Sequence, residues 1–205
     1  MSELDADAIG ARTPGRYGAS PPLLVLAETI IEVAWNIQGD VAREAFADAV
    51  TNAFRVDLPA TPNTSTRMNR IRALWLGPGS WLLVSGMGPP PLPFADFIAQ
   101  RDTVNAAGGA LFDVSASRVA FTLRGARAGP VLAKRCPLDF HARAFAPGRV
   151  AQSVFGHVNA LFVRVDDGAA FTVMVARSYA RDVWHALCES AAVDGYEVEP
   201  PAPLE

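Results

Sequence analysis

The chain has 205 residues, half of them apolar, a formal net charge of −3 and two cysteines. That length is enough for one sizeable core or for two small modules that share an interface. The weakly acidic balance excludes the positive surface that nucleic-acid binding requires, and the widely separated Cys136 and Cys188 favour reduced thiols over a disulfide framework.

The N-terminus and the most apolar stretch of the chain do not suggest targeting to a membrane. The first ten residues, MSELDADAIG, are acidic and polar, unlike a signal peptide. The most apolar stretch, residues 23–31, is interrupted by Glu28 and is too short to cross a bilayer. We therefore expect a soluble, cytoplasmic protein.

Composition divides the chain into a folded part and two arms. Residues 1–22 are rich in Gly, Pro, Ala and Ser without periodicity, which predicts a flexible N-terminal arm. The C-terminal tail, residues 197–205, has a similar composition. A single folded unit, residues 23–196, lies between them and contains two repeats, about 29–108 and 109–193.

The first repeat begins with alternating apolar residues over 31–37, which predict a half-buried strand. Asp40 follows Gly39 and is placed to cap a helix. The apolar face of that helix comprises Val41, Ala42, Ala45, Phe46, Ala49, Val50 and Phe54. Strands over 71–75 and 81–85 then flank a Gly-rich turn, and another helix begins near residues 94–98.

The second repeat has the same order of elements. A strand over 119–123 ends at Gly125, and a short helix follows to Arg135. Its start is expected near residue 129, because Pro130 is tolerated only in a first turn. Strands over 161–165 and 171–175 flank the turn Asp166-Asp167-Gly168, and the last helix carries Tyr179, Val183, Leu187 and Ala191.

The two repeats can be aligned, with VAWNIQGDVAREAF over VAFTLRGARAGPVL, so that Gly39 and Gly125 take equivalent positions. Each repeat is strand–helix–strand–strand–helix, and the strand over 119–123 completes the ferredoxin-like order of the first repeat. The predicted fold is therefore α+β, with two interlocked ferredoxin-like βαββα repeats and an antiparallel sheet covered by helices.

The segment from Asp113 to Val158 is the most distinctive part of the chain. Its stretches SASRV, LRGARAGPVLAKRCPLDFHARAFAPG and AQSVFGHV resemble the gamma-subunit family of heterotetrameric sarcosine oxidase. The hairpin RALWLGPGSWLLV and the closing VARSYARDVWHALCESAA extend the resemblance to roughly residues 29–193.

The resemblance implies an aminomethyltransferase-like (folate-binding) fold and a non-catalytic gamma subunit. The implied partners are alpha and beta subunits that carry FAD, FMN and NAD, and a delta subunit that holds zinc. That complex oxidises sarcosine with oxygen to glycine and hydrogen peroxide, and tetrahydrofolate accepts the one-carbon unit. No cofactor is expected on the gamma chain itself.

A stand-alone folate-binding or aminomethyl-transferring protein is the alternative. The duplicated fold favours it, whereas the small size of the chain opposes it. Related folate-dependent repair proteins carry a K-G-C-[YF]-x-G-Q-E motif, but here Lys134-Arg135-Cys136 continues as Pro137-Leu138-Asp139. No folate-enzyme active site can therefore be transferred to this sequence.

The remaining reactive side chains do not form a recognisable site. The histidines and cysteines lack the close spacing typical of zinc ligands; they are His141, His157, His185, Cys136 and Cys188. Three serines, Ser115, Ser117 and Ser153, lack a G-x-S-x-G elbow. Asp166 and Asp167 fit a turn, and Asp113 and Asp139 fit helix or turn caps, better than catalysis.

The aromatic residues suggest a core and one contact surface. The tryptophans, Trp35, Trp75, Trp81 and Trp184, mostly fit inward-facing positions. Phe140, Phe145 and Phe155 accompany prolines in a segment too apolar for water and too rich in proline for regular structure. We therefore expect these three phenylalanines to form a subunit interface with the large alpha chain, and no catalytic, cofactor-binding or metal residues.

Overall fold

The structure is a computed structural model that describes residues 13–86, 96–165 and 169–204. The chain divides into two compact units. Unit 1 comprises residues up to Thr29, Ser117–Pro147 and Ala151–Ala202, and unit 2 comprises Ile30–Ala116, Gly148–Val150 and the last three residues. No helix of the described ranges is long and apolar enough to cross a membrane.

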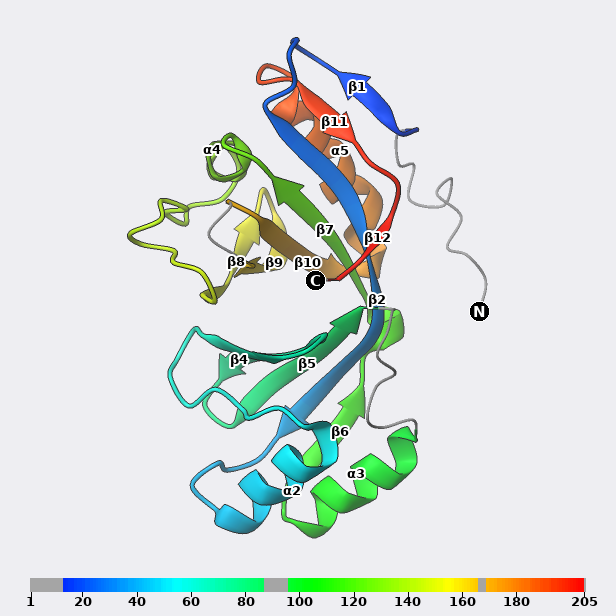
Figure 1. Cartoon of the computed structure of the whole chain (residues 1–205), viewed down its shortest axis with the longest axis vertical. Helices are drawn as coiled ribbons and strands as arrows, with labels where there is room; N and C mark the ends of the chain where they lie inside the picture. Colours follow the sequence, from blue (N-terminus) through cyan, green and yellow to red (C-terminus); the bar gives the residue numbers. More distant parts are fainter. Residues whose placement is uncertain (1–12, 87–95, 166–168, 205) are drawn as a thin grey trace. The chain divides into compact units, whose positions relative to one another are not determined.

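Unit 2 has the ferredoxin-like topology. Its elements are the second half of β2 (Leu24–Gln38), then α2 (Glu44–Phe54), β3 (Ser65–Met68), β4 (Ile71–Gly77), β5 (Ser80–Gly86), α3 (Phe97–Ala106) and β6 (Ala110–Asp113). The sheet order is β3-β4-β5-β2-β6, and all neighbours are antiparallel. Helices α2 and α3 contact each other (Figure 1), and buried side chains such as Phe46, Phe54 and Trp81 form the core.

Unit 1 repeats this plan with one exchange. Its own elements are β7 (Arg118–Arg124), α4 (Ala128–Ala133), β8 (Val150–Phe155), β9 (Val158–Arg164), β10 (Phe171–Ala176), α5 (Ala180–Ala191) and β11 (Tyr196–Val198). The sheet order is β8-β9-β10-β7-β2-β11-β1, where β1 is Gly15–Tyr17. The first half of β2 therefore takes the edge of β7 that a closing strand occupies in a ferredoxin-like fold.

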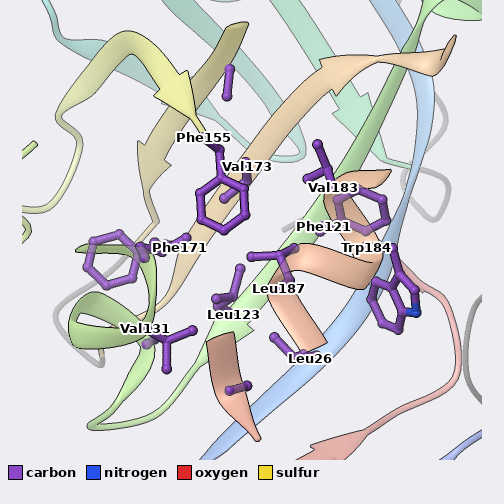
Figure 2. Packing of buried hydrophobic residues seen from close by; sticks show 14 of the residues in the cluster. Leu26, Phe121, Leu123, Val131, Phe155, Phe171, Val173, Val183, Trp184 and Leu187 are labelled. Atoms are coloured by element: carbon purple, nitrogen blue, oxygen red, sulfur yellow. The ribbon is translucent and has the colours of Figure 1, made fainter. Parts of the chain in front are cut away.

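The core of unit 1 forms where α5 covers β7 and β10. Figure 2 shows Phe121 and Leu123 from β7, Val173 from β10, and Leu187 and Trp184 from α5 directed into one cluster. The aromatic rings of Phe121 and Trp184 lie 5.4 Å apart. Apolar residues at intervals of four on α5 produce this packing, as the sequence predicts.

Several predicted elements are confirmed by the structure. The hairpin of β4 and β5, the strands β9 and β10, and the helices α2, α3, α4 and α5 all form where the sequence predicts them, within a few residues. Helix α4 begins at Ala128, so Pro130 lies in its first turn. Phe94, the Gly86-Met87-Gly88 segment beyond Gly86, and the Asp166-Asp167-Gly168 turn lie outside the described residues.

The prediction that Asp40 caps the first helix is wrong. Helix α2 begins at Glu44, with Arg43 in the cap position. The Asp40 carboxylate instead accepts a hydrogen bond from the Ala42 backbone N–H at 2.9 Å. Asp side chains commonly stabilise a turn in this way, because they reach the backbone two residues ahead.

The strand that closes the first repeat also differs from the prediction. Strand β6, which the sequence did not suggest, pairs with β2 and completes unit 2, whereas residues 119–123 belong to β7 of unit 1. Only Leu111 of the four residues in β6 is buried. A strand this short gives too few alternating positions to be recognised from sequence.

Both expected arms contain paired strands. Residues 15–17 form β1 and pair with β11, which includes Glu197 and Val198 of the expected tail. Strand β11 in turn pairs in parallel with the beginning of β2. Val198 and Leu204 are buried, so short apolar segments hold these polar ends to the sheet.

Candidate functional site

The part of the distinctive segment between α4 and β8 forms an irregular loop stabilised by local hydrogen bonds. The Asp139 carboxylate accepts from the His141 backbone N–H at 2.8 Å, which confirms its prediction as a turn cap. The His141 Nδ1 atom accepts from the Arg143 backbone N–H at 3.3 Å. The side chains of Asp139 and His141 therefore stabilise the conformation of the loop.

The three phenylalanines expected at an interface lie in the interior of unit 1. Phe140, Phe145 and Phe155 are 6%, 5% and 2% exposed. The ring of Phe140 lies 5.4 Å from that of Phe162 and 5.5 Å from that of Phe171, both edge to face. The core of the chain therefore absorbs their apolar surface, and the argument that they require a partner no longer holds.

A cavity of about 440 Å³ lies between α4 and this loop. Small residues of α4, among them Gly129, leave the space open, and Leu138 and Phe171 line it. Its buried cation is Arg164, which donates to the Phe145 carbonyl at 3.0 Å and lies 5.5 Å from the centre of the Phe171 ring. The lining is mainly apolar, and its charged residues are Arg164 and Asp139.

The chain's single lysine joins α4 to the end of α5. Lys134 Nζ donates to the Ser190 carbonyl at 2.6 Å and to Asp194 at 2.8 Å, and Arg127 donates to the same carboxylate at 2.6 Å. The hydrogen bond from Lys134 is the main cause of the lowered pKa of Asp194, against a smaller rise from burial. Ammonium groups commonly satisfy the last carbonyls of a helix, so this cluster has a structural role.

The cysteines and histidines are not assembled as metal ligands. Neither Cys136 nor Cys188 forms a disulfide, and both are buried in the same core cluster. Within the ranges that the structure describes, no three His, Cys, Asp or Glu side chains are grouped so that they could hold a metal ion. Asp113, the other predicted cap, accepts from the Ser115 backbone N–H at 2.9 Å and from its hydroxyl at 2.6 Å.

Sequence reasoning missed a pair of arginines on the sheet of unit 2. Arg72 in β4 and Arg67 in β3 are directly opposite each other. Arg72 is only 6% exposed, and burial, together with the charge of Arg67, lowers its pKa to about 10. The sequence did contain a sign of this pair, because Arg72 lies between Ile71 and Ala73 in an otherwise apolar strand. Side chains alternate along a strand, so Arg72 lies on the face opposite to those two residues.

Comparison with known proteins gives a consistent relationship. A model of the "Sarcosine oxidase, gamma subunit family" matches residues 38–193. Two similar proteins named sarcosine oxidase subunit gamma come from Corynebacterium sp. (strain P-1), 30% identical over 132 residues, and Arthrobacter sp., 32% identical over 97 residues. The matches cover 63% and 46% of this chain, but only 60% and 44% of those relatives.

Solved structures confirm the predicted fold class. A chain of heterotetrameric sarcosine oxidase from Corynebacterium sp. U-96 superposes with a TM-score of 0.73 at 24% identity, covering 87% of this chain and 88% of that one. The glycine cleavage system aminomethyltransferase T from Bartonella henselae gives a TM-score of 0.55 at 15% identity, covering 88% of this chain and 48% of that one.

The family match includes the segment that carries the resemblance seen in the sequence, from Asp113 to Val158. It extends through the helices and hairpins of both units. On this ground, the chain belongs to the sarcosine oxidase gamma subunit family.

Proposed function

We propose that this chain is a non-catalytic gamma subunit that supports assembly of a heterotetrameric sarcosine oxidase with alpha, beta and delta subunits. The proposed complex oxidises sarcosine with oxygen to glycine and hydrogen peroxide and passes the one-carbon unit to tetrahydrofolate. The observation that carries the proposal is the family match over residues 38–193.

The use of the polar side chains supports a structural role for the chain. Lys134 and Asp194 connect two helices, while Asp139 and Asp113 stabilise turns. Each of these groups contacts its own backbone or a neighbouring side chain within hydrogen-bond distance. Under the proposal, FAD, FMN, NAD, tetrahydrofolate and zinc are bound by the partner subunits.

A folate-binding protein that acts alone is the second candidate, since the fold resembles that of an aminomethyltransferase. This chain corresponds to 48% of that enzyme's length. A transferase of that kind therefore contains a large region that the present match does not include.

Co-expression with the alpha, beta and delta subunits of the same organism tests the proposal. A tagged version of this chain should purify in a fixed ratio with a yellow complex that consumes oxygen when sarcosine is added. The chain alone should be colourless. Omitting it should lower the yield of the assembled complex.

If the chain is colourless and does not co-purify with the three subunits, the proposal is contradicted. Calorimetric titration of that chain with tetrahydrofolate then decides the second candidate. Saturable binding would support a folate-binding protein that acts alone.

A further inference from the structure

Arg72 is a buried cation that forms no ion pair with any residue the structure describes. Its Nη1 atom donates to the Ser65 hydroxyl at 3.3 Å, a weak contact. The ion pairs formed among the described residues include neither Arg72 nor Arg67. A guanidinium removed from water without a counter-charge is strongly unfavourable, so its retention requires a reason.

The charge of a nearby arginine, in contrast, is neutralised by a carboxylate of the same chain. Arg70, between Arg67 and Arg72 in sequence, forms an ion pair with Glu32 of β2 and also donates to the Gly86 carbonyl. The chain thus neutralises one of three closely spaced arginines. The other two are in none of the ion pairs that the described residues form.

The strand register makes the arrangement more specific. Arg67 and Arg72 are direct cross-strand partners, and like charges in this position repel each other. An anion that accepts hydrogen bonds from both guanidinium groups converts the repulsion into two attractions. A carboxylate has the required pair of oxygens, since guanidinium groups bind it through parallel hydrogen bonds.

Access to the pair is available from the edge of the sheet. Strand β3 is the outermost strand in the sheet order of unit 2; residues 148–150 pair with the chain at Thr64 and Ser65, whereas Arg67 and Met68 are exposed. Among the described residues, the Arg67 guanidinium donates to the Asn69 carbonyl alone, at 2.7 Å. An incoming carboxylate can therefore meet Arg67 first and Arg72 behind it.

We propose that Arg72 and Arg67 form a carboxylate-binding site, with Arg72 as the buried anchor. The carboxylate is either an Asp or Glu side chain of a partner subunit or a free small carboxylate. Only the first source rests on the function proposed above, so the two can be tested separately.

Binding of a free small carboxylate is tested on the full chain alone. Sodium acetate is compared with sodium chloride at equal ionic strength by thermal unfolding. Bound acetate at ten times its Kd should raise the Tm by about 3–5 °C. Arg72→Met should abolish this difference without lowering the Tm in chloride, because an uncompensated buried charge is removed. Arg101→Met is the matched control, since Arg101 already pairs with Asp102.

Binding of an Asp or Glu side chain of a partner subunit is tested by co-purification with the other three subunits. Arg72→Met should lower the fraction of this chain recovered in the complex at least tenfold, whereas Arg101→Met should not change it. Arg72→Lys should be intermediate, because lysine keeps the charge and loses the planar fork.

Each result has one meaning. If acetate raises the Tm of wild type but not of Arg72→Met, the site binds a free carboxylate. If Arg72→Met no longer co-purifies with the other subunits, the site binds a carboxylate of a partner subunit. No acetate effect together with normal assembly of Arg72→Met overturns the site. If wild type itself does not assemble, the proposed function fails, and the acetate experiment alone decides this inference.

Discussion

Asp194 shows how a single carboxylate links pH to stability. Lys134 and Arg127 hold its pKa below the ordinary value of 3.8. A depressed carboxyl pKa stabilises the fold above the unfolded-state value, and the contribution is lost as pH falls through the folded-state value.

We predict that Asp194→Asn lowers the Tm at neutral pH by about 2–6 °C. The difference from wild type should shrink as the pH falls below 3.8, because the unfolded state then takes up a proton while Asp194 of the folded protein stays ionised until its lower pKa is reached. Thermal unfolding between acidic and neutral pH measures this. Asp102→Asn on the exposed surface should show little effect, and a constant difference for Asp194→Asn at all pH values would refute the assignment.

Glu28 in β2 behaves in the opposite way. Burial raises its pKa above 4.5, and Arg177 only partly offsets the rise. Because the raised pKa favours the protonated form in the folded state, its stabilising contribution is present below pH 4.5 and is lost as pH rises through the folded-state pKa.

Glu28→Gln should therefore raise the Tm at neutral pH, by about 1–3 °C, and should match wild type near pH 4. Exposed Asp48→Asn serves as the comparison. A lower Tm for Glu28→Gln at neutral pH would show that ionised Glu28 is instead a favourable partner of Arg177.

At the scale of elements, Gly195 joins the N-terminal segment to the end of α5. Its φ is +68°, and a Cβ atom there would lie 1.9 Å from the Ala19 carbonyl oxygen. Hydrogen bonds from Ala19 to Ala192 and from Leu23 to Gly195 fasten the same segment.

Gly195→Ala should displace this segment and increase hydrogen exchange over residues 15–26. Gly156→Ala is a matched control, because Gly156 has φ of +64° but nothing within 4 Å of the added Cβ. The control should cost only the conformational term, about 1 kcal/mol. Equal Tm losses and equal exchange in the two variants would contradict a close approach at Gly195.

Periodicity identified most elements but not their partners. The alternation of β4, β5 and β10 and the four-residue spacing of α5 are local properties, so they could be recognised from sequence. Strands β1, β6 and β11 are four residues or fewer. They form because distant segments supply hydrogen-bond partners, and no local pattern contains that information.

At the scale of the whole molecule, β2 belongs to both units. Its first half lies between β7 and β11 in unit 1, and its second half lies between β5 and β6 in unit 2. Because the two halves are one continuous strand, loss of β2 pairing in one unit can extend along the strand into the other, which favours a single cooperative transition.

Hydrogen exchange at increasing urea concentrations tests this cooperativity. The free energies of opening for β5 and β10 should converge. Phe46→Leu, in the core of unit 2, should lower both by the same amount, about 1 kcal/mol. A loss of protection confined to β5 would show that the units unfold independently.

The sequence by itself determined the helices and most of the longer strands of both repeats, the α+β class and the family, since these depend on local periodicity and on a continuous run of residues; it missed β3 and β8, the strands that follow α2 and α4. The tertiary structure decided which strand closes each unit, because pairing joins segments far apart in sequence. It also decided that Phe140 is buried and that Arg72 has no counter-ion in the part of the chain that the structure describes, since burial and charge pairing depend on neighbours from several elements.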